Sequence, residues 1–431
     1  MREMKDSGVE WIGEIPEDWN VGKTLYALSM PITDGPHETP ELFDEGIPFI
    51  SAEAVSCGNG HIDFEHIRGF ISQEFYEECC KKYIPQINDI YMIKSGATTG
   101  KVAKVETQKL FTIWSPLAVF RVEPQRCYYE YLYYFIQSDA YQKQIENKWT
   151  YGTQQNIGMR TLEKLMICFP SITQQKLIAD YLDSKCSKID EIIEKQQAII
   201  EKLKEYKLSI ITEAVTSGIN PDVEMKDSGS VWFGSIPTNW EMKRLKYVFH
   251  IQKDIAGEEG HTVLSITQKG IIPKDFSNNE GQFANSYANY QLVHKGDFAM
   301  NHMDLLTGWV DISKYEGVTS PDYRVFVLND KNGMCPEYYL YMMQMCYSAR
   351  IFYGLGQGVS GMGRWRLQAD KFLNFHIPIP PYDEQKIIAD YITDKVNHIE
   401  VEIDKRNKLV EKYQEYKKSL IYEVVTGKKE V

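Results

Sequence analysis

The sequence predicts a mixed α/β (α+β) fold in which two pseudo-symmetric globular domains are separated by two long antiparallel coiled-coil helices. The first observation is duplication, because residues 4–8 (MKDSG) return as 225–229, and residues 175–182 (QKLIADYL) return as 385–392 (QKIIADYI). The second is that two poorly matched inserts carry the β-branched and aromatic runs of strands. The third is a long apolar helical pattern after each insert. A period of 221 residues (225 − 4) is far too long for a solenoid, so this is a duplicated domain pair.

Each repeat is predicted to run as an arm, a mixed domain and a long helix. We expect an N-terminal arm and first domain over residues 1–170, a central helix over 171–221, a second arm and domain over 222–380, and a C-terminal helix over 381–431. Each arm carries two tryptophans with an Ile-Pro dipeptide between them, and proline disfavours helical geometry in the residue before it. The arms are therefore predicted to be extended, packing either on their own domain or between the two repeats.

Both inserts are predicted to be mixed α/β. Strands are expected at residues 47–50, 89–93, 117–122, 262–266 and 323–328, and helices at 128–136 and 338–343. A faint common skeleton remains, because Asp89-Ile90 in the first insert matches Asp297-Phe298 in the second. We infer that the inserts share one fold whose surface has diverged.

The helical segments have coiled-coil patterning, with apolar residues at spacings of three and four and with Glu and Lys on the flanks. Neither run of roughly 40 residues is interrupted by Gly or Pro, which corresponds to about 60 Å of helix. Antiparallel pairing of the two helices would place the inserts at opposite ends. The coiled-coil candidates are Ile189, Ile192, Ile199, Leu203, Tyr206 and Ile210 in the first helix and Ile399, Ile403, Leu409, Tyr413, Tyr416 and Leu420 in the second.

The net charge argues against a stand-alone polyanion-binding domain. The 431 residues include 48 Lys and Arg against 60 Asp and Glu, a formal charge of −12. Residues 21–169 have 14 basic and 18 acidic side chains, hence −4, and residues 241–380 have 14 of each, hence 0. Phosphate contacts come from Lys and Arg. If nucleic acid is the ligand, positive charge must cluster on one face or come largely from a partner.

Cysteine usage and hydropathy indicate a protein that is not exported. The eight cysteines show no C-x-x-C pair and no spacing shared by the repeats, so neither structural zinc nor a disulfide framework is expected. The sequence has no run of about 18 apolar residues and no basic-then-apolar leader. A cytoplasmic protein without a membrane span is therefore expected.

Three stretches resemble ligand-binding motifs without meeting their requirements. Residues 95–101 (SGATTGK) have one residue too few between the glycines of a phosphate loop, and Val102 replaces the Mg²⁺-binding hydroxyl. Residues 356–361 (GQGVSG) lack the apolar strand that precedes a dinucleotide-binding turn. Residues 380–382 (PPY) follow Ile379 instead of the polar residue with which amino-methyltransferases hold a base. No catalytic residue and no metal site is predicted, so the chain is not expected to be an enzyme on its own.

Candidate nucleic-acid contacts are amide and basic side chains in or beside glycine-containing loops. Gln and Asn can bond bidentately to adenine and Arg to guanine, so these types suit the readout of base edges. Lys94 and Lys101 flank a glycine turn and are candidates for contact with a backbone phosphate. The candidates are Lys94, Lys101, Gln154, Gln155, Asn156 and Arg160 in the first insert and Gln357, Ser360, Arg364 and Arg366 in the second.

Together with the copied helices, several short motifs resemble the specificity subunit of a type I restriction–modification system over essentially the whole chain. The motifs that carry this resemblance are Asp34-Gly35-Pro36-His37, residues 46–50 (GIPFI), residues 94–100 (KSGATTG) and the pre-helix segments 170–176 and 380–386. The second insert lacks the Asp-Gly-Pro-His and Ser-Gly-Ala-Thr motifs and has Asn301-His302-Met303-Asp304 where the latter would fall.

The resemblance implies a DNA-recognition subunit whose inserts are two target recognition domains, each reading one half of a bipartite site in double-stranded DNA. It implies that the helices set the spacing of the halves and, through the coiled-coil candidates above, dock two methyltransferase subunits. Those partners would carry S-adenosylmethionine and methylate adenine, and two further restriction/translocase subunits would use ATP and Mg²⁺. No cofactor is expected in this chain.

Two alternatives remain open. A duplicated coiled-coil scaffold for protein ligands would not bind DNA, so footprinting of its complete complex would give no sequence-dependent protection. A self-contained DNA enzyme would transfer methyl groups when incubated alone with DNA and S-adenosylmethionine.

Overall fold

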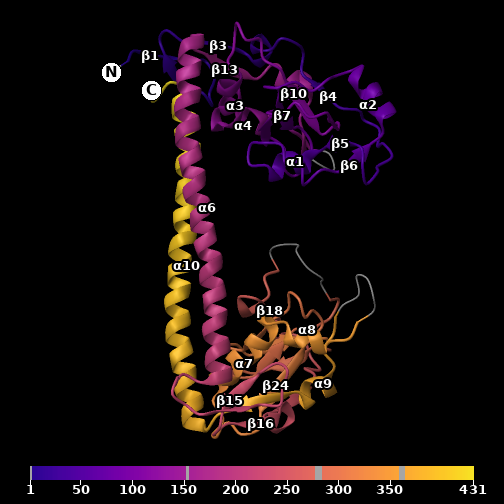
Figure 1. Ribbon diagram of the computed structural model, residues 1–431, viewed down its shortest axis with the longest axis vertical. Coiled ribbons are helices and arrows are strands. Elements are labelled where there is room, and N and C mark those ends of the chain that lie inside the picture. Colours follow the sequence, from indigo (N-terminus) through magenta and orange to yellow (C-terminus); the bar gives the residue numbers. More distant parts are fainter. Residues whose placement is uncertain (1, 152–154, 277–283, 359–364) are drawn as a thin grey trace. The chain divides into compact units, whose positions relative to one another are not determined.

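The chain folds into two compact units, and each unit draws on both repeats. The structure is a computed structural model that describes residues 2–151, 155–276, 284–358 and 365–431 (Figure 1). Unit 1 comprises Met1–Gln197 and Lys408–Val431, and unit 2 comprises Ala198–Asn407. The long helices α6 (Ile172–Ser217) and α10 (Tyr382–Val425) each contribute to both units. This combination of helices and strands confirms the predicted fold class.

Each arm is a β-hairpin rather than a single extended segment. β1 (Met4–Asp6) pairs with β2 (Glu14–Pro16), and β14 (Met225–Asp227) pairs with β15 (Ser235–Pro237). The copied Lys-Asp-Ser-Gly motif explains the turns, because the Gly8 amide donates to Asp6 Oδ1 (2.9 Å). The Gly229 amide donates to Asp227 Oδ1 at the same distance, 2.9 Å. The two glycines have φ angles of 71° and 67°, in the left-handed region that other residues disfavour.

The hairpins pack on the end of the long helix that follows the other insert. In unit 1, Trp19 is buried in one hydrophobic cluster with Val424 and Val425 of α10. In unit 2, Trp240 is buried in one cluster with Val215 of α6. Each arm therefore contacts a helix of the other repeat, as one of the two predicted packing arrangements requires.

Each domain is built on a four-stranded antiparallel sheet with the same strand order. In unit 1 the order is β4 (Thr33–Asp34), β10 (Leu117–Phe120), β7 (Ile90–Ile93) and β8 (Val102–Lys104). In unit 2 it is β17 (Phe249–Gln252), β24 (Arg324–Leu328), β21 (Phe298–Met300) and β22 (Val310–Ile312). The registers also agree, because Phe120 lies opposite Ile90 and Phe326 lies opposite Phe298. The two inserts therefore share one fold.

Smaller sheets and short helices complete each domain. Unit 1 adds a three-stranded sheet of β6 (Gly69–Ile71), β5 (Ile47–Ile50) and β9 (Thr112–Ile113), with helices α1 (Ala52–Cys57) and α2 (Gln73–Cys80). Unit 2 adds the pairs β18 (Leu264–Thr267) with β19 (Gly270–Pro273) and β20 (Gln291–Val293) with β23 (Gly317–Thr319). Helices α3 (Tyr129–Gln137), α4 (Asp139–Glu146) and α5 (Met159–Leu162) in unit 1 correspond to α7 (Pro336–Ser348), α8 (Ile351–Leu355) and α9 (Ala369–Asn374) in unit 2. The strands and helices predicted in the inserts are present, with shifted ends.

A further pair of strands leads the chain into each long helix. β13 (Met166–Phe169) pairs with β3 (Asn20–Lys23), and β25 (His376–Ile379) pairs with β16 (Glu241–Arg244). A buried tyrosine joins each pair to a helix end. The Tyr131 hydroxyl lies within hydrogen-bonding distance of the carbonyl oxygens of Cys168 (3.0 Å) and Val425 (3.2 Å). Tyr338 makes the matching contacts in unit 2, with the carbonyl oxygens of Pro378 (3.1 Å) and Val215 (3.3 Å).

Within each unit, the segments of α6 and α10 pair antiparallel (Figure 1). In unit 1, the Lys417 ammonium donates to Asp190 Oδ1 (2.7 Å), and in unit 2, the Lys207 ammonium donates to Glu400 Oε1 (2.6 Å). Apolar side chains fill the seam between these polar contacts. They include Leu182, Cys186, Ile189 and Leu420 in unit 1 and Ile200, Ile210, Ile399 and Ile403 in unit 2.

Most of the coiled-coil candidates are at least partly buried, but three lie on the surface. Ile189, Ile210, Ile399, Ile403 and Leu420 are buried, and Ile192, Ile199, Leu203 and Tyr413 are partly buried. Tyr206, Leu409 and Tyr416 are exposed, whereas Ile200 and Val410 are buried. Ile210 and Leu420, one step further along the same stripes, are buried again, so the exposed residues lie at the edge of the buried face. The three exposed residues lie outside the seam, and their role in docking stays a prediction.

A buried glutamine in the copied Gln-Lys motif anchors each long helix. The Gln175 side chain accepts a hydrogen bond from the Tyr128 amide (2.8 Å) and donates one to the Pro170 carbonyl oxygen (3.0 Å). Gln385 makes the same two bonds in unit 2, with the Cys335 amide (3.0 Å) and the Pro380 carbonyl oxygen (2.9 Å). The motif is therefore explained by the attachment of each helix to its own domain.

Replacing Gln175 by Leu should destabilise unit 1, because the side chain keeps its approximate size but leaves an amide and a carbonyl without partners. An unpaired buried polar group costs about 1–3 kcal/mol, and urea unfolding should show a loss of at least this size. Thr173→Val, at an exposed position in the same turn, is the matched control. An unchanged midpoint for Gln175→Leu would contradict the anchoring role.

Candidate nucleic-acid interface

In unit 1, the glycine turn that follows β7 meets the hairpin of β11 (Thr150–Tyr151) and β12 (Gln155–Asn156). The Ile157 amide donates to the Lys94 carbonyl oxygen (2.9 Å), and the Gly96 amide donates to the Gln155 carbonyl oxygen (3.0 Å). Asn156 also forms an isolated bridge with Ser95 of the turn. Three predicted contact residues, Lys94, Gln155 and Asn156, are thus brought together at one end of the central sheet. We call this meeting point, residues 94–96 with 155–157, the unit 1 junction.

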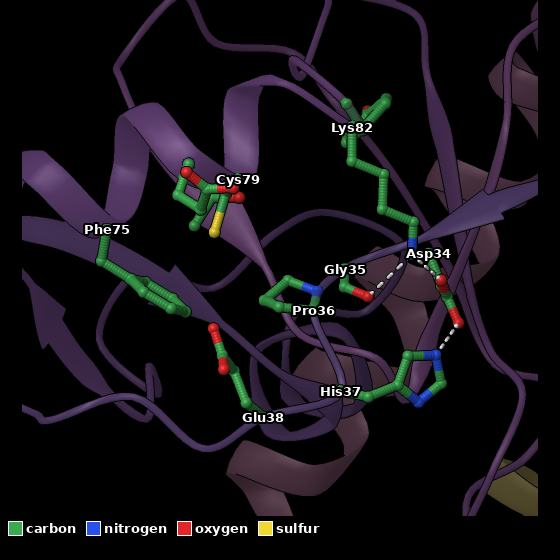
Figure 2. A pocket seen from close by; sticks show the side chains of 11 residues that line it. Asp34, Gly35, Pro36, His37, Glu38, Phe75, Cys79 and Lys82 are labelled. Atoms are coloured by element: carbon green, nitrogen blue, oxygen red, sulfur yellow. Dashed lines mark hydrogen bonds and ion pairs between the residues drawn. The ribbon is translucent and has the colours of Figure 1, made fainter.

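A buried carboxylate holds the unit 1 junction to the sheet. The Asp34 side chain is 1% exposed, and its Oδ2 lies 3.3 Å from Lys94 Nζ and 3.1 Å from His37 Nε2. Lys82, just after α2, bonds to the other carboxylate oxygen (Figure 2). The Lys94 side chain is only 11% exposed, so its ion pair fixes the turn to β4. The exposed cation of the same loop is Lys101, which donates to the Ser56 carbonyl oxygen (3.3 Å).

The Asp-Gly-Pro-His motif lines a cavity of about 320 Å³ (Figure 2). Phe75 and Cys79 of α2 lie across from Pro36, and the lining also includes Glu38, Glu78, Tyr83 and Thr112. Gly35 is required at this place, because a Cβ there would lie 1.9 Å from the Ile113 carbonyl oxygen. The glycine and the buried Asp34 therefore serve the structure of the loop.

Unit 2 has the same junction with different side chains. The Leu367 amide donates to the His302 carbonyl oxygen (3.0 Å), which repeats the bond between Ile157 and Lys94. Gln357 and Arg366 are joined by two backbone bonds (2.9 and 3.0 Å), as β11 and β12 are in unit 1. His302 therefore takes the place of Lys94, and Arg366 takes the place of Asn156. We call residues 301–303 with 365–367 the unit 2 junction.

An arginine and a histidine are buried at the unit 2 junction. Arg324 on β24 is 5% exposed, and its Nη2 donates to the Leu367 carbonyl oxygen (2.8 Å). Burial, together with the positive charges of Arg324 and Arg366, lowers the pKa of His302 to about 3. Burial lowers the pKa of Arg324 to about 10. At neutral pH the histidine is therefore neutral and the buried arginine is charged.

The predicted contact residues differ in exposure. Lys101, Asn156, Arg160, Gln357 and Arg366 are exposed, whereas Lys94 and Gln155 are partly buried. Arg160 lies on the short helix α5 and takes no part in the backbone bonds of the unit 1 junction described above. Gln154, Ser360 and Arg364 lie outside the described residues. Contact with DNA stays a prediction for all of these residues.

Sequence reasoning missed the charges that support both junctions, namely the buried Asp34 and Arg324 and the exposed Lys82 that pairs with Asp34. A signal was present for Arg324, because it begins an otherwise apolar strand (RVFVL), and a buried charge in such a strand needs a partner or a function. No local signal links Lys82 to Asp34, since 48 residues separate them.

The part of the chain that the structure describes offers no obvious metal or membrane site. Within residues 2–151, 155–276, 284–358 and 365–431, no group of three or more His, Cys, Asp and Glu side chains is placed to hold a metal ion. Over the same ranges, every helix is too short or too polar to cross a bilayer.

Comparison with known proteins identifies the class. Two segments, residues 36–207 and 237–412, match the family described as the type I restriction modification DNA specificity domain. The chain is 26% identical over 434 residues to the putative type I restriction enzyme MjaX specificity subunit of Methanocaldococcus jannaschii, covering 97% of this chain and 95% of the relative. It is 24% identical over 389 residues to the MjaVIII specificity subunit of the same organism, covering 85% of each.

The chain belongs to the type I restriction–modification DNA specificity family. A chain from a solved structure concerned with complex assembly and conformational transition of a type I R-M system aligns with a TM-score of 0.67 at 12% identity, covering 95% of this chain and 98% of that chain. That likeness supports the fold. The class predicted from the copied helices and short motifs, a specificity subunit, is confirmed. Such subunits are non-catalytic parts of type I systems.

The lowered pKa of His302 predicts a pH-dependent loss of stability. The unfolded chain takes up a proton near pH 6.5, whereas folded His302 stays neutral down to about pH 3. The stabilising effect of this difference is present above about pH 6.5 and is lost as the pH falls toward 3. Urea midpoints at pH 7, 6 and 5 should therefore fall less for His302→Asn than for the unchanged protein. His376→Asn, at an exposed position in unit 2, is the control, and identical pH profiles for all three proteins would refute the argument.

Proposed function

We propose that the chain reads a bipartite DNA sequence, with one half-site for the domain of each unit. The main support for this proposal is that the two domains share one backbone arrangement but have different side chains at the junctions. Both units have the same strand order in the central sheet and the same backbone bond just after a central strand. In unit 1 this bond follows β7 and joins Ile157 to Lys94, and in unit 2 it follows β21 and joins Leu367 to His302. One junction presents amides and the other presents arginine, and these side-chain types suit different base edges.

The proposal assigns positioning to the long helices and chemistry to partners. As a 46-residue helix, α6 corresponds to about 70 Å of rod, and α6 and α10 would fix the number of unread base pairs. Two methyltransferase subunits would carry S-adenosylmethionine and would flip and methylate adenine. Two restriction/translocase subunits would supply the ATP- and Mg²⁺-dependent steps. These partners would also contribute positive surface, which the chain lacks at a net charge of −12, and the complex would work in the cytoplasm.

A matching apolar pair on each long helix supports docking of the same partner twice. Leu177 and Ile387 occupy equivalent positions in the copied motif and are 54% and 56% exposed. Four residues on, Tyr181 and Tyr391 share that face, each with a lysine ammonium 5.7 Å from the ring centre. Single exposed apolar residues are ordinary. Retention of the same pair in both copies favours a common partner, which we take to be the methyltransferase subunit.

The bipartite reading is tested by a domain exchange. In cells that supply the partner subunits, the methylated bases should define two short sequences separated by a fixed number of unread base pairs. Replacing residues 21–169 with the equivalent insert of another specificity subunit should change one half-site and leave the other half-site and the spacing unchanged. Long-read sequencing of the host genome measures all three quantities.

Two outcomes of the exchange would contradict the proposal. A change in both half-sites would rule out two independent readers. No sequence-dependent methylation or protection by a correctly assembled complex would favour a protein scaffold without DNA recognition.

The docking surface is tested by charge insertion. The double variant Leu177→Asp with Ile387→Asp should lower recovery of the methyltransferase subunit with the chain by about tenfold or more, because a carboxylate would have to be desolvated in an apolar contact. The matched control is Ser187→Asp with Asn397→Asp, at equivalent exposed positions further along the same helices. Equal recovery for both double variants would show that the partner binds elsewhere.

A further inference from the structure

The unit 2 junction contains a buried positive charge that has no counterpart in unit 1. Arg324 lies opposite Met300 in the sheet, and Ala118 lies opposite Met92 at the equivalent place in unit 1. Ala118 in turn pairs with Asp34 on the neighbouring strand. Unit 1 therefore places a carboxylate beside its junction, whereas unit 2 places a guanidinium.

No carboxylate balances Arg324 among the described residues. Its polar contact there is the bond from Nη2 to the Leu367 carbonyl oxygen, and its guanidinium lies 4.9 Å from the centre of the Phe372 ring. Within the same described ranges, its Nη1 and the Nδ1 of His302 are buried without a hydrogen-bond partner. A buried charge without an opposite charge is destabilising. A charge buried at this cost marks the place as a candidate for function.

The buried arginine bonds to the backbone segment that carries an exposed arginine, Arg366. The carbonyl oxygen that Arg324 binds belongs to Leu367, the residue next to Arg366. His302 bonds to the amide of the same Leu367 and is close enough to feel the charges of both arginines. The amide and the carbonyl oxygen of Arg366 itself are bonded to the backbone of Gln357. The exposed Arg366 side chain thus belongs to a segment whose backbone is held at Arg366 and at Leu367, with the buried charge of Arg324 beside it.

We propose that Arg366 reads a guanine in the half-site of unit 2, and that Arg324 is the residue that positions it. A guanine edge offers two acceptors, O6 and N7, which match the paired donors of a guanidinium. Arg324 fixes the backbone beside Arg366 and adds positive potential where these acceptors would lie. The equivalent place in unit 1 carries Asn156 beside a buried carboxylate, so the two half-sites should differ at this position. This inference rests on the proposed function, because it assumes that unit 2 reads DNA.

The test compares four variants of the full chain in its complex with the partner subunits. They are Arg366→Ala, Arg324→Met, Arg324→Lys and the control Lys371→Ala, an exposed lysine of unit 2. Methylated sequences are mapped in cells, and binding is measured on duplexes with guanine or 7-deazaguanine at each G·C pair of the second half-site. Thermal unfolding of each variant reports whether unit 2 remains folded.

Arg366→Ala should lower binding by about 5- to 150-fold for duplexes with guanine at one position, and should relax methylation at that position alone. The same variant should make 7-deazaguanine at that position nearly neutral. Arg324→Met should relax the same position without lowering the thermal unfolding temperature, because removal of a buried charge without an acidic partner offsets the loss of the bond to the Leu367 carbonyl oxygen. Arg324→Lys should retain part of the discrimination, and Lys371→Ala should retain all of it.

Three outcomes would overturn the inference. Equal weakening of all sequences by Arg366→Ala, with a smaller dependence on salt, would indicate a contact with phosphate instead of a base. Loss of folding in Arg324→Met, with relaxation of the whole second half-site, would indicate a structural role only. A bipartite site that all variants leave unchanged would exclude the arginines and leave the proposed function intact, whereas absence of any bipartite site would remove both.

Discussion

Each hydrophobic core is closed by the end of a helix that the other repeat encodes, and the remaining structure depends on this closure. Tyr131 binds the carbonyl oxygen of Val425 at the end of α10, and Tyr338 binds that of Val215 at the end of α6. Trp19 shares a buried cluster with the end of α10, and Trp240 shares one with the end of α6. Burial of apolar surface is the main driving force of folding. One repeat alone would therefore leave both its domain and its helix end exposed.

This dependence explains which residues are copied and which have diverged. The arm motif forms the turn of a hairpin, and the glutamine of the helix motif bonds to its own domain through Tyr128 or Cys335. These contacts are internal to each unit and must be made twice. The central sheet keeps its strand order and register in both units. The junction after β7 carries Lys94 and Asn156, whereas the junction after β21 carries His302 and Arg366. The divergence at the junctions lies away from the contacts that close the core.

The charges at the two junctions are arranged in opposite ways. Asp34 in unit 1 is surrounded by Lys82, Lys94 and His37, so a buried acid organises the neighbouring basic side chains. Arg324 in unit 2 has no acidic partner among the described residues, and burial together with the charges of Arg324 and Arg366 lowers the pKa of His302. The two units therefore bury charges of opposite sign on different strands of the common sheet, beside the same backbone position. A common fold with replaceable charges is well suited to two readers of different sequences.

The duplicated frame, the mixed α/β inserts and the long paired helices follow from the sequence, because they depend on local periodicity and on direct repetition. The details of burial do not. Tyr206, Leu409 and Tyr416 fit the apolar pattern but are exposed, because the elements that pack on a helix, and not spacing alone, decide which of its apolar residues are covered. Lysine is a residue type that commonly binds phosphate, yet the partner of Lys94 is the Asp34 carboxylate, 60 residues earlier in the chain (94 − 34). Contacts between residues distant in sequence are set by the packing of strands and helices. For this reason, the tertiary structure alone decided which charges are buried together at each junction.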